Sequence, residues 1–213
     1  MESSKSGTYF FECSNSRCGL RFPLDTGLYE GRYCPRCGSN LERREAGIPA
    51  QKPPAAASPK VRIIGALDNI RSALNVGAIF RTADGAGLSG LLLGGITPTP
   101  EEQPAIAKTA LGAEKNISWS YHPNLPQTLA ELKSKNCLIL VLECAPGASS
   151  LQEFHLHHPL PDQVALVVGN EPAGVDPAIL RMADQVLYLP MSGEKSSLNV
   201  SVAFGIAVYQ LLG

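Results

Sequence analysis

The feature that most constrains the fold is a series of short, almost continuously apolar runs from Val61 onward. Six of them are expected to be strands: 61–67, 91–95, 117–121, 137–143, 164–169 and 186–190. Strands that are apolar along their whole length are buried on both faces, which is typical of a parallel sheet. Helical patterns separate them, at 75–86, 102–112, 125–135, 174–183 and 198–212. The sequence therefore predicts an α/β domain with a mostly parallel sheet and helices on both faces.

Length and composition agree with one main domain and a small appendage. The 213 residues allow between one and two domains at roughly 150 residues each. A hydrophobic fraction of 44% is too high for a disordered chain. No apolar run approaches the ~20 residues of a membrane span, and the N-terminus lacks a basic segment followed by an apolar core. We therefore expect no export signal, no membrane partner and a cytoplasmic, reducing environment.

Four of the six cysteines lie within the first 37 residues, at Cys13, Cys18, Cys34 and Cys37. Their C-x4-C and C-x2-C pairs have the spacing of a four-cysteine zinc site. Residues 1–45 carry few large apolar side chains, so a bound metal would supply the folding free energy of a small zinc ribbon. The alternative is four unrelated thiols in a cytosolic chain. We predict structural Zn²⁺ held by these four cysteines.

Residues 46–60 contain four prolines and five alanines and no large aromatic side chain, which predicts an extended linker. Residues 1–60 carry 9 Lys and Arg against 6 Asp and Glu, whereas residues 61–213 carry 9 against 13. Zinc thiolates would cancel most of that basic excess, so charge alone does not identify a nucleic-acid partner. The ribbon arginines are either an RNA-binding surface or an ordinary solvated one: Arg17, Arg21, Arg32, Arg36, Arg43 and Arg44.

Several common cofactor and catalytic motifs are excluded. A G-x-G-x-x-G pattern occurs at Gly85, Gly87 and Gly90, but these glycines end a predicted helix, whereas a dinucleotide fingerprint opens one. We interpret them as a helix-stop turn, which argues against a nucleotide-dependent oxidoreductase. The chain has no P-loop and no G-x-S-x-G elbow. Four histidines in or beside a Pro-flanked loop are interpreted as surface residues: His122, His155, His157 and His158.

Three further segments carry polar residues and glycines in patterns more specific than those motifs. The first has Asn75 and Arg81 six residues apart at a helix start. The second follows a strand with Gly169 and Glu171 at the carboxyl edge of the sheet, where a bare backbone would leave room for a ligand. The third leads into the last helix. Taken singly, each is compatible with turn and capping chemistry. The segments are 75–85, 167–175 and 189–201.

Together and in this order, the three segments resemble the motifs of the SpoU/TrmH family of RNA 2'-O-ribose methyltransferases, over about residues 61–213. The resemblance implies a parallel α/β domain with a C-terminal trefoil knot, S-adenosylmethionine held in the knot loops, and a homodimer through the helices near 75–86 and 198–212. The sequence departs from the family pattern at Pro172-Ala173 and in its N-terminal extension. The RNA target, tRNA or rRNA, therefore stays open.

Carried over position by position, the resemblance implies two sets of site residues. The catalytic set is Asn75, Arg81, Glu171, Ser197 and Asn199. The cofactor set is Glu143, Cys144, Gly169, Asn170, Glu171, Leu189, Met191 and Leu198. Arg81 is too basic for a general base, so we expect it to clamp the phosphate beside the ribose and stabilise developing alkoxide.

Each role has a simpler alternative. Arg81 would instead pair with Asp84 on a helix surface, and Glu171 would cap the helix predicted at 174. At the level of the whole chain, the alternative is an RNA-binding factor that keeps the knotted scaffold without catalysis. The presence of Arg81, Glu171 and Asn199 together argues against lost catalysis.

Overall fold

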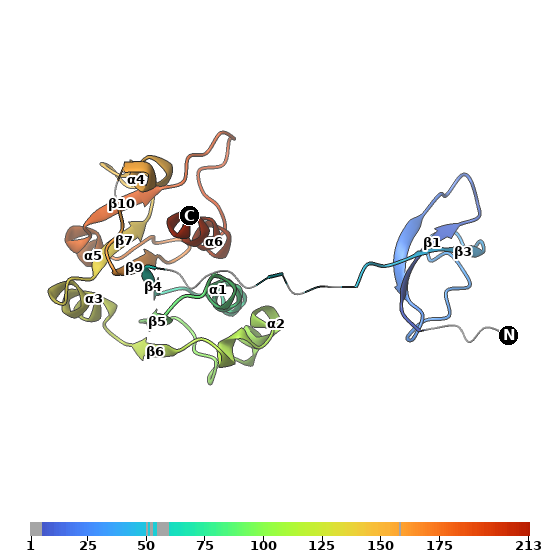
Figure 1. Ribbon diagram of the computed structural model, residues 1–213, viewed down its shortest axis with the longest axis horizontal. Helices are drawn as coiled ribbons and strands as arrows, with labels where there is room; N and C mark the ends of the chain where they lie inside the picture. The colour runs from blue at the N-terminus through green and yellow to red at the C-terminus, as the bar shows by residue number, and fades with distance from the viewer. Residues whose placement is uncertain (1–5, 50, 52, 55–59, 158) are drawn as a thin grey trace. The chain divides into compact units, whose positions relative to one another are not determined.

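The computed structural model describes residues 6–49, 51, 53–54, 60–157 and 159–213. The chain divides into two compact units, Met1–Ala56 and Ala57–Gly213 (Figure 1). Much of the predicted linker, at 50, 52 and 55–59, lies outside the described residues, as does His158.

The N-terminal unit is a three-stranded antiparallel sheet in the order β2-β1-β3. Its strands are β1 Thr8–Cys13, β2 Arg21–Asp25 and β3 Leu41–Ala46. Among the residues described in this unit, only Phe11, Cys13 and Cys34 are buried. An apolar core of this size is too small to stabilise a fold without a further cross-link.

The second unit contains a seven-stranded sheet in the order β6-β5-β4-β9-β7-β10-β8, in which all neighbouring strands are parallel. The strands are β4 Arg62–Asp68, β5 Gly90–Gly94, β6 Trp119–His122, β7 Leu138–Leu142, β8 Ser149–Ser150, β9 Gln163–Val168 and β10 Gln185–Tyr188. All six predicted strands are present, with ends shifted by one or two residues. The short polar β8 was not predicted.

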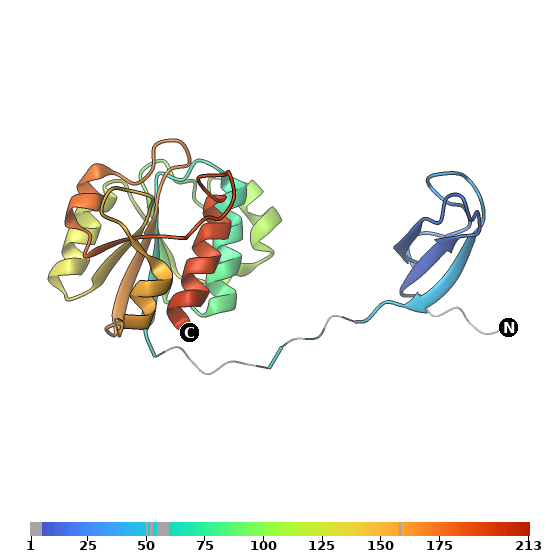
Figure 2. The ribbon, with the colours of Figure 1, turned by 90° about the horizontal axis from the view of Figure 1, so that it is seen from above.

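Helices cover both faces of this sheet (Figure 2). On one face, α1 and α6 contribute Phe80 and Phe204 to the larger apolar cluster; on the other, α3 and α5 contribute Leu129 and Ile179 to the smaller one. The predicted α/β architecture is confirmed. No helix of the described residues is long and apolar enough to cross a membrane. The helices are α1 Ala73–Ala86, η1 Pro104–Ile106, α2 Ala107–Ala110, η2 Ala113–Lys115, α3 Leu125–Ser134, α4 Leu151–His157, α5 Pro177–Met182 and α6 Val200–Leu212.

Three predicted helices agree with the structure to within two residues at each end, and the other two differ more. The continuous helix expected at 102–112 is instead η1, α2 and η2, because Leu111 and Gly112 adopt left-handed backbone conformations with φ of 52° and 96°. The helix expected from 174 begins only at Pro177, where the side chain of Asp176 caps it. Left-handed residues and caps of this kind end or start helices.

The histidine segment was predicted as a loop, and this prediction was wrong for His155 and His157, which belong to α4. Leu151 and Phe154 of the same helix are buried in the larger apolar cluster, so packing against the sheet outweighs the polar composition. His122 ends β6 as expected beside a loop.

The glycine-rich segment after α1 is a helix-stop turn, as predicted. Gly87 caps the helix in the left-handed conformation, with φ of 70°, and its N–H reaches the carbonyl oxygens of Ala83 and Asp84. Strand β5 then begins at Gly90. These glycines therefore end a helix and do not form a dinucleotide-binding turn.

Candidate active site and metal centre

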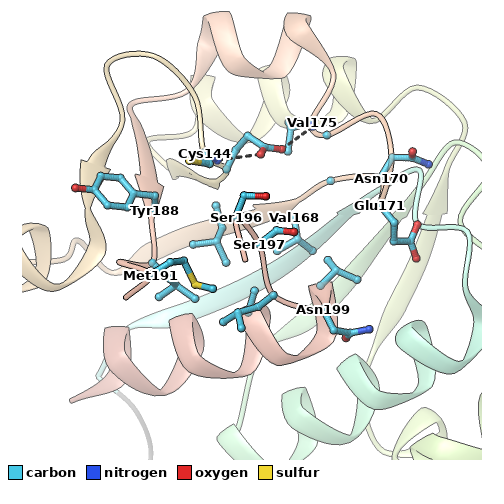
Figure 3. A pocket seen from close by; sticks show the side chains of 18 of the residues that line it. Cys144, Val168, Asn170, Glu171, Val175, Tyr188, Met191, Ser196, Ser197 and Asn199 are labelled. Carbon is cyan, nitrogen blue, oxygen red and sulfur yellow. Dashed lines mark hydrogen bonds between the residues drawn. The ribbon is translucent and has the colours of Figure 1, made fainter. Parts of the chain in front are cut away.

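A cavity of about 1080 Å³ lies at the carboxyl ends of β7, β9 and β10 (Figure 3). Stretches from 142–144, 168–175 and 188–200 line it. All eight residues of the predicted cofactor set are among the lining residues, together with Ser197 and Asn199. Asn75 and Arg81 are not. The carboxyl edge is where open parallel sheets bind their ligands.

The loop that follows β9 folds back tightly on itself beside this cavity. A Cβ atom on Gly169 would lie 2.5 Å from the backbone carbonyl carbon of Gly174 and from the nitrogen of Val175. We expected the bare backbone at Gly169 to leave room for a ligand, but the space beside it is occupied by the backbone of Gly174 and Val175. Glu143 holds the far end of the loop, because its Oε2 accepts a hydrogen bond from Val175 N at 3.1 Å.

The chemistry of the lining fits S-adenosylmethionine. Met191 and Leu198 are 38% and 39% exposed, so apolar surface is present for a ligand to cover. Apolar walls with a few polar groups are typical of cofactor pockets, and here they suit an adenine ring. Three glutamates and one lysine line the same cavity, so its acidic groups outnumber its basic ones and suit a cationic ligand: Glu143, Glu171, Glu194 and Lys195.

Three residues from the three motif segments form one hydrogen-bonded chain. Asn75 donates through Nδ2 to Glu171 Oε1 at 2.9 Å, and Asn199 donates through Nδ2 to Asn75 Oδ1 at 3.0 Å. Asn199 also caps α6 by accepting from the backbone N–H of Ser201. The fold thus brings together the start of α1, the loop after β9 and the start of α6. Ser197, two residues before Asn199 in the sequence, also lines the cavity.

Glu171 holds the N-terminus of a helix, but a different helix from the one expected. Its carboxylate accepts from the backbone N–H groups of Arg71 at 3.1 Å and Ser72 at 3.3 Å, just before α1. Burial acts to raise the pKa of Glu171, but these donors and Asn75 outweigh it and lower the pKa. The alternative in which Glu171 caps the helix predicted at 174 was wrong, because Asp176 caps that helix.

Arg81 lies in a second cavity, of about 580 Å³, lined by residues of α1, α2 and α6. Lys108 and Tyr209 share this cavity with Arg81. Within the described residues Arg81 forms no ion pair, so the alternative in which it pairs with Asp84 has no support. The structure does not bring Arg81 to the cofactor cavity of its own chain.

Two charged residues were not predicted from the sequence: Lys108 at the Arg81 cavity and Asp68 beside the cofactor loop. Lys108 was placed inside a long predicted helix, and nothing in the local pattern linked it to Arg81. Asp68 follows the apolar run of β4 at the same edge of the sheet as Gly169. A carboxylate directly after a buried strand was the signal that could have identified it.

The four N-terminal cysteines form a single cluster. Their sulfur atoms all lie within 4.8 Å of one another, with Cys13 and Cys37 Sγ atoms 3.4 Å apart and Cys18 and Cys34 Sγ atoms 3.8 Å apart. Zinc–thiolate bonds of about 2.3 Å in a tetrahedron place sulfurs roughly 3.8 Å apart, so the cluster fits this ion. Hydrogen bonds from Ser39 lower the pKa of Cys37 to about 6, which favours the thiolate that binds metals, whereas burial raises the pKa of Cys13 to about 12. A bound metal ion would deprotonate such a thiol.

Most arginines of the N-terminal unit are engaged inside it. Three pair with glutamates, and Arg43 lies over the ring of Tyr9 with its Cζ 3.3 Å from the centroid. Arg17 and Arg36, both between metal-site cysteines, form no ion pair with the described residues. These two are therefore the arginines of the described residues here that lack both an acidic and an aromatic partner. The engaged arginines are Arg21, Arg32, Arg43 and Arg44.

The fold is that of the knotted SpoU/TrmH methyltransferases, in agreement with the trefoil knot implied by the resemblance. The AdoMet-bound rRNA methyltransferase of Sinorhizobium meliloti superimposes with a TM-score of 0.64 at 26% identity, over 73% of this chain and 57% of that one. The TrmH/SpoU tRNA modifying enzyme of A. aeolicus superimposes with a TM-score of 0.62 at 30% identity, over 72% and 76%.

The chain belongs to the SpoU rRNA methylase family, whose model matches residues 62–209. The 23S rRNA (guanosine(2553)-2'-O)-methyltransferase RlmP of Bacillus subtilis is 37% identical over 147 residues, covering 69% of this chain and 56% of that protein. The 23S rRNA (guanosine-2'-O-)-methyltransferase RlmB of Acinetobacter baylyi is 33% identical over 151 residues, covering 68% and 57%. This chain thus spans a little over half the length of these relatives.

Proposed function

We propose that this protein transfers a methyl group from S-adenosylmethionine to a ribose 2'-hydroxyl of rRNA or tRNA. The observation that carries the proposal is the chain of hydrogen bonds Glu171–Asn75–Asn199, which joins all three family motifs at one end of the cofactor cavity. The names of its relatives, which are rRNA and tRNA methyltransferases, support the same substrate class. Such a substrate implies a cytoplasmic protein.

S-adenosylmethionine supplies, when bound, a methyl group on a cationic sulfonium that needs no metal for activation. The task of the protein is alignment, because methyl transfer is an in-line displacement. Asn75 and Ser197 orient the ribose, and the loop 169–175 holds the cofactor side. Arg81 clamps the neighbouring phosphate and stabilises the alkoxide that forms as the hydroxyl loses its proton.

We propose that the active enzyme is a homodimer. Val202, Ile206 and Tyr209 lie on one face of α6 and are 50%, 44% and 57% exposed. Two of these, Val202 and Tyr209, line the cavity that contains Arg81. An exposed apolar face of this kind marks an interface. In such a dimer, Arg81 of one copy would lie near the cofactor cavity of the other copy. This arrangement would explain why Arg81 does not line the cofactor cavity of the chain that carries it.

We further propose that residues 1–45 are a zinc ribbon that contacts RNA, that 46–60 link it to the enzyme, and that 61–213 are the methyltransferase domain. One Zn²⁺ held by Cys13, Cys18, Cys34 and Cys37 would replace the missing apolar core of the ribbon. Arg17 and Arg36, which have no acidic partner in the described residues, are free to contact phosphate.

The experiment that tests the proposed function is tritium transfer from labelled S-adenosylmethionine to RNA. After alkaline hydrolysis of the RNA, ribose methylation would leave the label at a nucleotide whose 3' phosphodiester bond is uncleaved. A methylated 2'-oxygen cannot attack that phosphate. Cofactor binding without transfer to any RNA would favour the alternative, a knotted RNA-binding factor without catalysis.

A further inference from the structure

Asp68 is a buried carboxylate beside the loop that lines the cofactor cavity, and the proposed chemistry does not use it. It ends β4 and is 1% exposed. Its Oδ2 accepts from the backbone N–H of Asp176 at 2.7 Å, and its Oδ1 accepts from Asn69 Nδ2 at 2.8 Å. No cation pairs with it among the described residues. Burial raises its pKa, and these two donors act against that rise.

The neighbouring Asn69 contacts the other end of the same loop. Its backbone carbonyl accepts from Asn170 Nδ2, with 2.6 Å between the two atoms. Its own φ of 57° is held by the side-chain Oδ1, which accepts from Ile96 N at 3.1 Å. Asp68 and Asn69 thus contact Asp176 and Asn170, which lie at the two ends of the loop after β9.

The loop between these two anchors is the one that lines the cofactor cavity. Residues 169–175 all contribute to the lining, and Glu171 within the loop is tied to the start of α1. Burying a carboxylate costs free energy unless its oxygens are well satisfied. An apolar side chain would fill the position of Asp68 at lower cost, but it would leave the N–H of Asp176 without an acceptor.

We propose that Asp68 is a positioning residue that fixes the shape of the loop 169–175 for the bound cofactor. It acts through the backbone of Asp176 and through Asn69, and it contacts neither the methyl group nor the ribose. This inference rests on the proposed function, because the ligand whose site it shapes is S-adenosylmethionine.

The test is Asp68→Asn, which keeps the size of the side chain but replaces one acceptor oxygen by a donor. One of the two N–H groups then loses its partner. We expect the Kd and KM for S-adenosylmethionine to rise about tenfold or more, while kcat at saturating cofactor stays within about threefold of wild type. Asp68→Glu, which keeps the charge but displaces the oxygens by one methylene, should raise the Kd in the same way.

The matched control is Thr97→Val. Thr97 is 2% exposed and its hydroxyl also braces the end of β4, donating to Leu67 O and accepting from Ile70 N. It touches no residue of the cofactor loop through these bonds. Thr97→Val should lower the Tm and leave the Kd for the cofactor unchanged, which separates positioning from general stability.

Unchanged cofactor Kd in a folded Asp68→Asn protein would overturn the proposal. Failure of both Asp68 variants to fold would also overturn it, because Asp68 would then be needed by the fold itself. The cofactor Kd is measured without RNA and without turnover. A wild-type protein that binds S-adenosylmethionine but methylates no RNA would therefore contradict the proposed function and leave this test intact.

Discussion

In the unit Ala57–Gly213, apolar side chains fill both faces of a seven-stranded sheet, whereas the described residues of the unit Met1–Ala56 bury one phenylalanine beside two cysteines. The unit Ala57–Gly213 can be stable through its hydrophobic core alone. The N-terminal unit has no comparable core among its described residues and depends on the cross-link that its four thiols can form through a metal. The two units of this chain should therefore unfold independently, one by loss of its hydrophobic core and the other by loss of its metal.

The largest expected effect is the loss of the metal site. In a Cys34→Ser, Cys37→Ser double variant we expect the N-terminal unit to unfold completely, because zinc binding contributes on the order of 10 kcal/mol to such modules. Metal analysis should fall from about one zinc per chain to nearly none, and the amide signals of this unit should collapse in NMR spectra. The Kd for S-adenosylmethionine should stay the same. An N-terminal unit that remains ordered without metal would contradict its dependence on zinc for folding.

The next effect concerns Arg81. Arg81→Ala should lower kcat by roughly 10² to 10³-fold, the loss typical of removing one oxyanion-type donor. Arg81→Lys should recover little of it, because a point charge does not reproduce the guanidinium fork. Lys115→Ala, on an exposed cation outside the Arg81 cavity, is the control. Single-turnover methylation at saturating RNA measures the effect. A near wild-type rate for Arg81→Ala would contradict the role of Arg81 and would assign the catalytic role to Ser197 or Asn75.

A smaller effect is expected from one methyl group on the cofactor loop. In Gly169→Ala the new Cβ would lie 2.5 Å from backbone atoms, so the loop must shift and the Kd for S-adenosylmethionine should rise roughly 10-fold to 100-fold. Gly193→Ala is a matched control in the same cavity, because its Cβ would meet nothing within 4 Å. Calorimetry that shows equal affinity in the two variants would mean that the loop does not shape the cofactor site.

The smallest effect should follow deletion of residues 1–45. We expect RNA affinity to fall about tenfold, as for the loss of one tethered contact, and the Kd for S-adenosylmethionine to stay unchanged. If Arg17 and Arg36 each neutralise one phosphate of a single strand, deletion should make the slope of log K against log salt concentration less steep by about 0.7 per lost contact. Equal RNA affinity and an equal salt slope in the truncated protein would remove the proposed role of this unit.

The parts of the fold that the sequence predicted well are those set by local patterns. The strands 137–143 and 164–169 were found because they are apolar along their length, and the turn at Gly87 because glycine tolerates a positive φ. Strand β8 is too short and polar to carry such a pattern. Helix α4 was missed because only tertiary packing of Phe154 shows that its polar sequence has a buried side.

The candidate site could be predicted less completely, because its geometry depends on contacts between distant segments. The motif residues were identified by resemblance, but the hydrogen bonds that join Asn75, Glu171 and Asn199 span about one hundred positions or more. The position of Arg81 away from the cofactor cavity follows from the packing of three helices. The two anchors of the cofactor loop, Asp68 and Asn69, have no signature in the sequence beyond their place after a strand.

The central claim is that the unit Ala57–Gly213 transfers methyl groups to ribose. The most direct measurement is transfer of labelled methyl from S-adenosylmethionine to RNA, followed by alkaline hydrolysis and mapping of the labelled nucleotide. With the wild-type protein we expect an alkali-resistant, 2'-O-methylated product, and with Arg81→Ala at least a roughly 100-fold lower rate. Label found on a base, or no label on any RNA from a protein that binds the cofactor, would contradict it.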